Sequence, residues 1–175
     1  MVKNTLSSDR ILLRSFQETD TDAIFAYRSL EDIAKYQYWE PYNHEDALNF
    51  IKSNLNSDLS SKEKWVGLAI ILKSDQKLIG DCAIRINKND AEIGCNISPE
   101  YQKFGYAKEA LHLLIDYCFQ NNAIDEIFGI TDSQNTASIQ LMQSMQMVKS
   151  DEFEEQIVCK GNISIEHKYF IKRPR

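Results

Sequence analysis

The hydrophobic positions of the chain change period several times, and these changes predict its first elements. Residues 10–14 form a short apolar run between charged residues, which is typical of a strand. Apolar residues then recur at helical spacing up to Leu30, so a helix is predicted. Thr19, with Asp22 three residues later, is predicted to cap it. Residues 31–36 fit a second, short helix.

The next part of the chain predicts one helix followed by a meander of strands. Asn43 is expected to cap a helix whose apolar face extends to Leu55. From Trp65 the pattern changes to strands, and short polar turns separate them. The predicted strands are 65–72, 78–86 and 91–97. Because the turns are too short for crossovers, the three strands should run antiparallel.

The C-terminal part alternates helices and strands. Apolar residues after Tyr106 follow a helical period. This long helix leads to a strand at 126–131, which can therefore lie parallel to 91–97 with a right-handed crossover. Asn135 begins another helix, and two strands end the chain, at about 155–159 and 165–171. The sequence predicts a mixed α+β fold over 1–175: one domain with a mostly antiparallel central sheet flanked by helices.

Composition and charge exclude several classes of protein. The chain has 175 residues and a formal net charge of −6, so it lacks the basic surface of a protein that coats nucleic acid. No apolar run reaches the roughly 18 residues of a membrane-spanning helix. The first ten residues lack the apolar core of a signal peptide. We therefore expect a cytoplasmic protein without nucleic-acid or membrane partners.

The cysteines and histidines do not have the spacing of a metal site. Each of the four cysteines falls in an apolar segment and is interpreted as a packing residue. The three histidines are far apart in the sequence. We expect no metal and no disulfide framework.

The chemically informative segment is the turn between the strand 91–97 and the long helix, residues 102–107. A helix N-terminus reached through a compact turn presents unpaired backbone N–H groups and favours an anion, most often a phosphate. Gly105 and Ala107 would let a ligand approach the backbone closely, and Lys103 could add positive charge. The segment matches neither the P-loop nor the dinucleotide-binding glycine pattern.

This turn resembles the [QR]-x-x-G-x-[GA] motif of the GNAT superfamily of acyl-CoA-dependent N-acyltransferases. The resemblance extends over the whole chain in order. The segment EIGCNISPEY resembles the strand that precedes the motif, and Asn135–Ser138 resembles the N-x-x-S motif of the RimJ/RimL-like branch. The opening RILLRSFQETD resembles the start of that branch.

The resemblance implies a binding site for acetyl-CoA as co-substrate. The family holds the pantetheine arm between two parallel strands that splay apart, where the backbone of Ile97 would pair with it. Asn135 and Ser138 would contact the arm near the thioester, although Asn135 is equally explained as a helix cap. Backbone N–H groups of the turn would hold the pyrophosphate: those of Gln102, Lys103, Phe104, Gly105, Tyr106 and Ala107.

The implied chemistry is the attack of a neutral amine on a thioester. A lysine-type amine, with a pKa of about 10.4, must first lose a proton, whereas an N-terminal amine at about 7.7–8.0 is easier to use. A backbone N–H of the strand 92–97 is expected to stabilise the oxyanion. Glu92 is the candidate base, acting through water, and its alternative is a solvent-facing strand residue without a chemical role.

Two positions depart from the family pattern. Met142 stands where many members have the tyrosine that protonates the CoA thiolate, so Ser138 becomes the candidate donor. Gln146 stands where the family usually has glycine, and we expect the preceding helix to end without a left-handed cap.

The acceptor is the least determined part of the prediction. Trp39 and Glu40, in the aromatic segment 36–42, are candidate substrate-binding residues, although Trp39 could equally anchor this loop on the core. The expected activity is acetyl-CoA-dependent acetylation of a primary amine, for example a ribosomal-protein N-terminus. The alternatives are a polyamine or aminoglycoside acceptor, or a CoA-binding sensor without catalysis. A second copy of the chain, forming a homodimer, is a further candidate partner.

Overall fold

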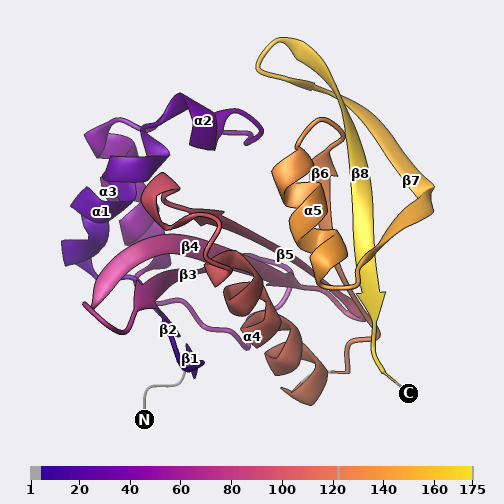
Figure 1. Cartoon of the computed structure of the whole chain (residues 1–175), viewed down its shortest axis with the longest axis horizontal. Coiled ribbons are helices and arrows are strands. Elements are labelled where there is room, and N and C mark those ends of the chain that lie inside the picture. The colour runs from indigo at the N-terminus through magenta and orange to yellow at the C-terminus, as the bar shows by residue number, and fades with distance from the viewer. Residues whose placement is uncertain (1–4, 122, 175) are drawn as a thin grey trace.

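The computed structural model describes residues 5–121 and 123–174, and its strands form an eight-stranded sheet in the order β1-β2-β3-β4-β5-β6-β8-β7 (Figure 1). The strands are β1 (Leu6–Ser7), β2 (Ile11–Arg14), β3 (Trp65–Leu72), β4 (Lys77–Ile86), β5 (Asp90–Ile97), β6 (Glu126–Asp132), β7 (Val148–Cys159) and β8 (Asn162–Lys172). The helices are η1 (Glu18–Asp20), α1 (Thr21–Arg28), α2 (Glu31–Ala34), α3 (His44–Asn54), η2 (Pro99–Tyr101), α4 (Tyr106–Asn121) and α5 (Thr136–Ser144).

The predicted fold class is confirmed. Strands β3, β4 and β5 form the expected antiparallel meander. Strand β6 returns through α4 and pairs with β5 in the parallel sense, as the length of the connection indicated. Antiparallel pairing elsewhere makes the sheet mixed, and helices cover it.

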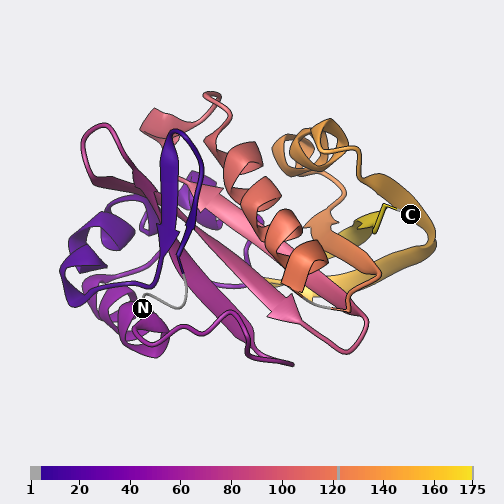
Figure 2. The ribbon, with the colours of Figure 1, turned by 90° about the horizontal axis from the view of Figure 1, so that it is seen from below.

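The two faces of the sheet are covered by different helices. Leu68 and Ile70 of β3 belong to a core cluster with Leu114 of α4, whereas Ala69 and Ile71 belong to a second cluster built with α1 and α3. Successive strand residues point to opposite faces, so α4 lies on one face and α1 and α3 lie on the other. Figure 2 shows α4 lying across the sheet. These two layers fix the position of the α4 N-terminus.

The predicted cap of the first helix is wrong by two residues. Gln17 and Asp20, rather than Thr19 and Asp22, form the capping box, at the start of η1. Asp20 is buried because it also accepts two hydrogen bonds from Arg14. Asp20 rather than Asp22 completes the capping box, and its contact with Arg14 cannot be read from residue spacing.

Two further predictions need correction at the C-terminal end. Gln146 adopts the left-handed conformation that was expected to be absent, with φ of +63°, and the Met147 N–H donates to the Met142 carbonyl (3.1 Å). The glutamine therefore completes the usual cap at some cost in strain. Strand β7 begins at Val148 rather than near Glu155. Its first part is polar and irregular in register, so it carries no strand pattern.

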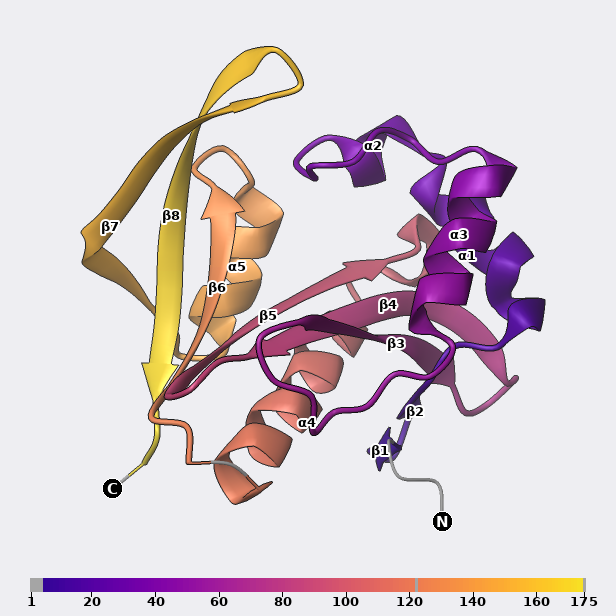
Figure 3. The same ribbon diagram turned by 180° about the vertical axis from the view of Figure 1, so that it is seen from behind.

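Strands β5 and β6 diverge soon after they meet. Their pairing covers three residue pairs and ends at Glu92 and Phe128, although both strands continue. Figure 3 shows β5 and β6 separating, with α2 and the β7–β8 hairpin on the two sides of the open end. Within the described residues, no helix is both long enough and apolar enough to cross a membrane.

Candidate active site

The opening between β5 and β6 exposes backbone groups of β5 that no strand takes up. Ser98 N–H donates to the Ile79 carbonyl (2.9 Å), and Ile97 is opposite Gly80 in the β4–β5 register. Because hydrogen-bonded and non-bonded pairs alternate in an antiparallel ladder, the N–H groups of Cys95 and Ile97 point away from β4, toward the opening. This is the arrangement that an extended amide-bearing ligand requires to add itself to a strand edge.

The turn before α4 presents a row of unpaired N–H groups. Lys103 and Gly105 have φ of +67° and +86°, and the first backbone hydrogen bond of α4 runs from Glu109 N–H to the Gly105 carbonyl (3.0 Å). Among the described residues, the N–H groups of Lys103, Phe104 and Gly105 have no backbone acceptor. A helix N-terminus of this kind fits a pyrophosphate. The side chain of Gln102 instead turns back and donates to the Ile97 carbonyl (2.9 Å).

Arg10 supports the turn from a strand edge and was not predicted from the sequence. Its guanidinium donates to the Phe104 carbonyl (3.0 Å), lies over the Tyr106 ring and forms an ion pair with Glu109. Burial raises the pKa of Glu109, but hydrogen bonds from Ser8 and Arg10 outweigh it and lower that pKa. Arg10 therefore neutralises the one acid in the first turn of α4, which would otherwise repel a bound phosphate.

The segment after β6 places Asn135 and Ser138 at the start of α5. The Asn135 side-chain oxygen accepts from the Ser138 backbone N–H (3.2 Å), so the helix-cap interpretation of Asn135 is confirmed. The Ser138 side chain is half-buried, and its hydroxyl has no hydrogen-bond partner among the described residues. A ligand contact by either residue stays a prediction.

Glu92 lies at the last paired position before the strands diverge. Its carboxylate forms an ion pair with Arg85 of β4 (2.6 Å) and is largely buried, so the alternative of a solvent-facing residue does not describe it. Burial raises the pKa of Glu92, Arg85 lowers it, and the charge of Glu166 raises it further, with a net rise. A carboxyl group perturbed in this way at a strand opening has the properties of a general base.

Met142 fills the space beside β6. It is 5% exposed, and a Cβ at Gly129 would lie 2.8 Å from its sulfur, so Gly129 is required for this close approach. Met142 is therefore a packing residue against β6, without a proton to donate.

Trp39 and Glu40 occupy different environments. The Trp39 ring packs at 4.9 Å from the Tyr42 ring and at 4.6 Å from the Arg28 guanidinium, which favours the anchoring interpretation. Arg28 forms a buried ion pair with Asp81 of β4 (2.7 Å). Glu40 is exposed. The aromatic segment 36–42 is thus held to the sheet: Trp39 packs on Arg28, and Arg28 pairs with Asp81 of β4. Hydrophobic periodicity could not predict this buried ion pair.

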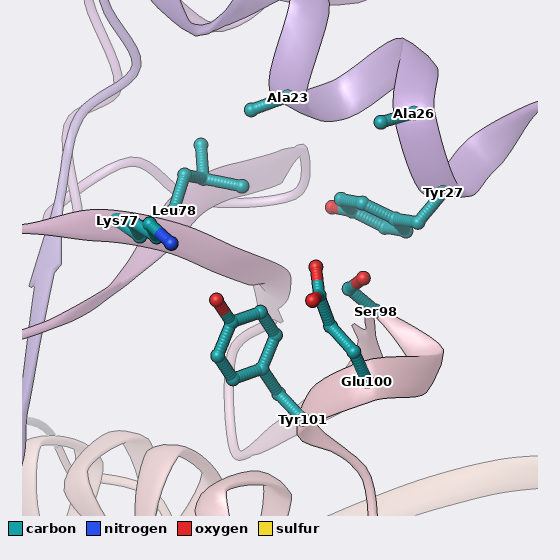
Figure 4. Close-up of a pocket in the computed structure, with 8 residues that line it drawn as sticks. All are labelled: Ala23, Ala26, Tyr27, Lys77, Leu78, Ser98, Glu100 and Tyr101. Atoms are coloured by element: carbon teal, nitrogen blue, oxygen red, sulfur yellow. The ribbon is translucent and has the colours of Figure 1, made fainter.

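A cavity of about 290 Å³ lies between α1, the start of β4 and η2 (Figure 4). Glu100 points from η2 toward α1, Tyr101 points toward Lys77 and Leu78 of β4, and Ala23 and Ala26 form part of the α1 wall. None of the residues predicted to bind the ligand lines this cavity. The residues predicted to hold the cofactor therefore lie at the turn and the opening, which form the candidate site.

The described part of the chain has no group of three or more residues arranged to hold a metal ion. Cys82 and Cys118 are fully buried in the core, as predicted for packing residues. Cys159 differs, because its sulfur lies 3.6 Å from the Gln37 carbonyl at the edge of the aromatic segment. Its role is a contact between segments rather than core packing.

Comparison with known proteins agrees with this geometry. The family model for the acetyltransferase (GNAT) domain matches residues 10–148. An uncharacterized N-acetyltransferase, p20 of Bacillus licheniformis, is 28% identical over 162 residues, covering 91% of this chain and 90% of the relative. A GNAT-family acetyltransferase structure from Bacillus anthracis superposes with a TM-score of 0.85 and 25% identity, covering 97% of this chain and 98% of the other.

A more distant structure also shares the fold. It is the spermidine N-acetyltransferase from Vibrio cholerae in complex with CoA and spermine. The TM-score is 0.75 at 19% identity, with 95% of this chain and 97% of the other covered. At this identity the likeness concerns the fold.

Proposed function

This chain belongs to the GNAT family of acetyltransferases, and we propose that it transfers the acetyl group of acetyl-CoA to the nitrogen of a primary amine. The observation that carries the proposal is the early end of the β5–β6 pairing, next to a turn with unpaired N–H groups. A pyrophosphate would bind the N–H groups of residues 102–107. The pantetheine arm would pair with the N–H of Ile97.

The reaction chemistry assigns a separate role to each side chain of the site. Acetyl-CoA supplies an activated thioester carbonyl. The carboxylate of Glu92 accepts the proton of the acceptor amine through water, and Arg85 holds that carboxylate in place. The Cys95 N–H, which points into the opening, is the candidate donor to the carbonyl oxygen. The Ser138 hydroxyl is the candidate donor to the departing sulfur.

The branch of the family is proposed from the Asn135–Ser138 motif, which resembles the RimJ/RimL-like enzymes. That branch includes enzymes that act on ribosomal-protein N-termini, so a protein N-terminus is one candidate acceptor. A polyamine or aminoglycoside is the other, with Trp39 and Glu40 as candidate contacts. A single domain over 1–175, a cytoplasmic location and a homodimer also stay proposals.

A CoA-binding sensor is the second candidate function, and Met142 is the observation that favours it. A buried methionine replaces a tyrosine that donates a proton in many family members, so catalysis would depend entirely on Ser138. If Ser138 does not act, ligand binding would survive without turnover.

One assay separates these functions. The protein is incubated with acetyl-CoA and a panel of peptides with free N-termini, polyamines and aminoglycosides, and the release of free CoA thiol is measured. The proposal predicts acceptor-dependent thiol release. Calorimetric binding of CoA without thiol release for any acceptor would support the sensor, and absence of CoA binding would contradict both.

A further inference from the structure

A short segment bridges the open end of β5 and β6. Residues 34–38, which we call the strap, run from the end of α2 toward the β7–β8 hairpin and the loop after β6 (Figures 1 and 3). Four hydrogen bonds hold it there: Lys160 Nζ to the Ala34 carbonyl (2.7 Å), Tyr36 Oη to the Gln134 carbonyl (3.2 Å), Cys159 Sγ to the Gln37 carbonyl (3.6 Å) and Tyr38 Oη to the Glu166 carboxylate. The strap therefore restricts what can enter from this side.

Glu166 is a buried carboxylate beneath the strap. It lies on β8, opposite Asp132 of β6, and is 8% exposed. The Tyr38 hydroxyl is its one hydrogen-bond donor, and no cation pairs with it, within the described part of the chain. A buried charge without an opposite charge is costly, and a second acid opposite it on the same face adds repulsion.

The cations on the same strand are engaged elsewhere. Lys168 forms an ion pair with Glu126 (2.6 Å), and His167 contacts Glu154 (3.2 Å). Neither cation pairs with Glu166, whose carboxylate accepts a hydrogen bond from the Tyr38 hydroxyl instead. The position is suited to a cation that the protein does not itself provide.

Glu166 pairs with Asp132 at the end of β6 that diverges from β5 beyond Glu92, so it lies along the open end. The charge of Glu166 adds to burial in raising the pKa of Glu92. Tyr38 is mostly exposed; its pKa is raised by partial burial, by the hydrogen bond to Glu166 and, to a smaller extent, by the charge of Glu92. The three groups therefore interact across the open end. A molecule that reacts beside Glu92 can place a second group at Glu166.

We propose that Glu166, with the Tyr38 hydroxyl, determines specificity by binding a second ammonium group of the acceptor. The acceptor is then a small, slender diamine or polyamine, with one amine directed to the acetyl group and another held under the strap. This inference rests on the proposed acetyl transfer. It chooses the small-amine acceptor over the protein N-terminus, because the strap confines the opening and Glu166 needs a cationic partner.

Matched acceptors test the inference on the wild-type protein. Putrescine and cadaverine differ from aminobutanol and aminopentanol only in that an ammonium group replaces a hydroxyl group. A hydrogen bond to a charged group is worth about ten- to hundred-fold in affinity, so kcat/KM should favour the diamines by roughly that factor. Equal values for the two classes of acceptor, or faster acetylation of N-terminal peptides than of diamines, would overturn the inference.

Variants assign the selectivity to one carboxylate. Glu166→Gln should lower the ratio of kcat/KM for diamines to kcat/KM for amino alcohols about tenfold or more, while the KM for acetyl-CoA stays unchanged. Glu155→Gln is the matched control, because Glu155 is the exposed neighbour of Glu166 on β7. It should keep the preference.

The outcomes distinguish the inference from the proposed function. If Glu166→Gln and Glu155→Gln weaken diamine use equally, only general surface charge is acting and the inference is wrong, although acetyl transfer stands. Unchanged acetyl-CoA KM in Glu166→Gln shows that this variant is folded. If no amine releases thiol from acetyl-CoA, the proposed function is wrong and the specificity inference is wrong with it.

Discussion

Replacing Arg28 with methionine should destabilise the protein far more than the loss of an ordinary ion pair. Arg28 is 5% exposed and Asp81 is 3% exposed, and they are joined by two hydrogen bonds. Burial alone would lower the pKa of Arg28, but Asp81 outweighs it and raises that pKa. Arg28→Met would leave the Asp81 charge buried and unpaired, which costs about 3–5 kcal/mol.

This loss is large compared with the whole stability of a domain, which is about 5–15 kcal/mol. The expected fall in the melting temperature is roughly 6 to 20 °C for a chain of this size. Urea denaturation followed by circular dichroism measures the free energy of unfolding directly. The control is Arg10→Met, because the Arg10–Glu109 pair is half exposed and should contribute only about 0–1 kcal/mol.

A double variant tests the reasoning rather than the size of the effect. Arg28→Met with Asp81→Asn removes the stranded charge and keeps an acceptor for the Tyr27 hydroxyl, which donates to Asp81. The double variant should therefore be more stable than Arg28→Met alone. If the two substitutions instead add to a greater loss, the buried charge is not the cause and this reasoning fails.

Three further predictions concern Glu92, Ser138 and Tyr38. Because burial raises the pKa of Glu92 and the base must be ionised, kcat should rise with pH through this raised pKa, above the ordinary range of glutamate. Glu92→Gln should remove that acidic limb and lower kcat about a hundredfold, so an unchanged pH profile would exclude Glu92 as the base. Ser138→Ala should lower kcat about a hundredfold without changing the melting temperature, since Asn135 accepts from the backbone of residue 138; unaltered turnover would remove Ser138 from the mechanism. Tyr38→Phe should speed hydrogen–deuterium exchange in residues 34–40, and protection equal to that of the wild type would show that the Glu166 contact does not hold the strap.

The sequence predicted the elements whose pattern is periodic and local. Strand β3 was predicted with its observed bounds, and the Asn43 cap of α3 was predicted because an asparagine before an apolar helical pattern is a local signal. The first part of β7 was missed because an exposed edge strand needs no apolar alternation. Gln146 was misjudged because the chain turns there to bury Met147 and to bond its N–H to the Met142 carbonyl, which residue type alone does not reveal.

In the candidate site, too, the local features could be predicted from the sequence and the contacts between distant segments could not. The turn at 102–107 could be found from a contiguous motif, whereas Arg10 lies about a hundred residues away and meets the turn only in the folded chain. The contact between Tyr38 and Glu166 likewise joins the beginning of the chain to its end. A charged residue within an apolar strand, as at Asp81, is the one sequence signal that could have indicated a buried partner.

The most direct test of the account is the affinity for CoA when the turn is altered. Gly105→Glu places a side chain at φ of +86° beside the unpaired N–H groups, whereas Gly161→Glu makes the same change at φ of +77° in the β7–β8 turn. Both variants carry a similar backbone strain of about 1–2 kcal/mol. Isothermal titration calorimetry should show wild-type affinity for CoA in Gly161→Glu and a loss of at least about tenfold in Gly105→Glu. Equal affinity for CoA in the two variants would contradict the account.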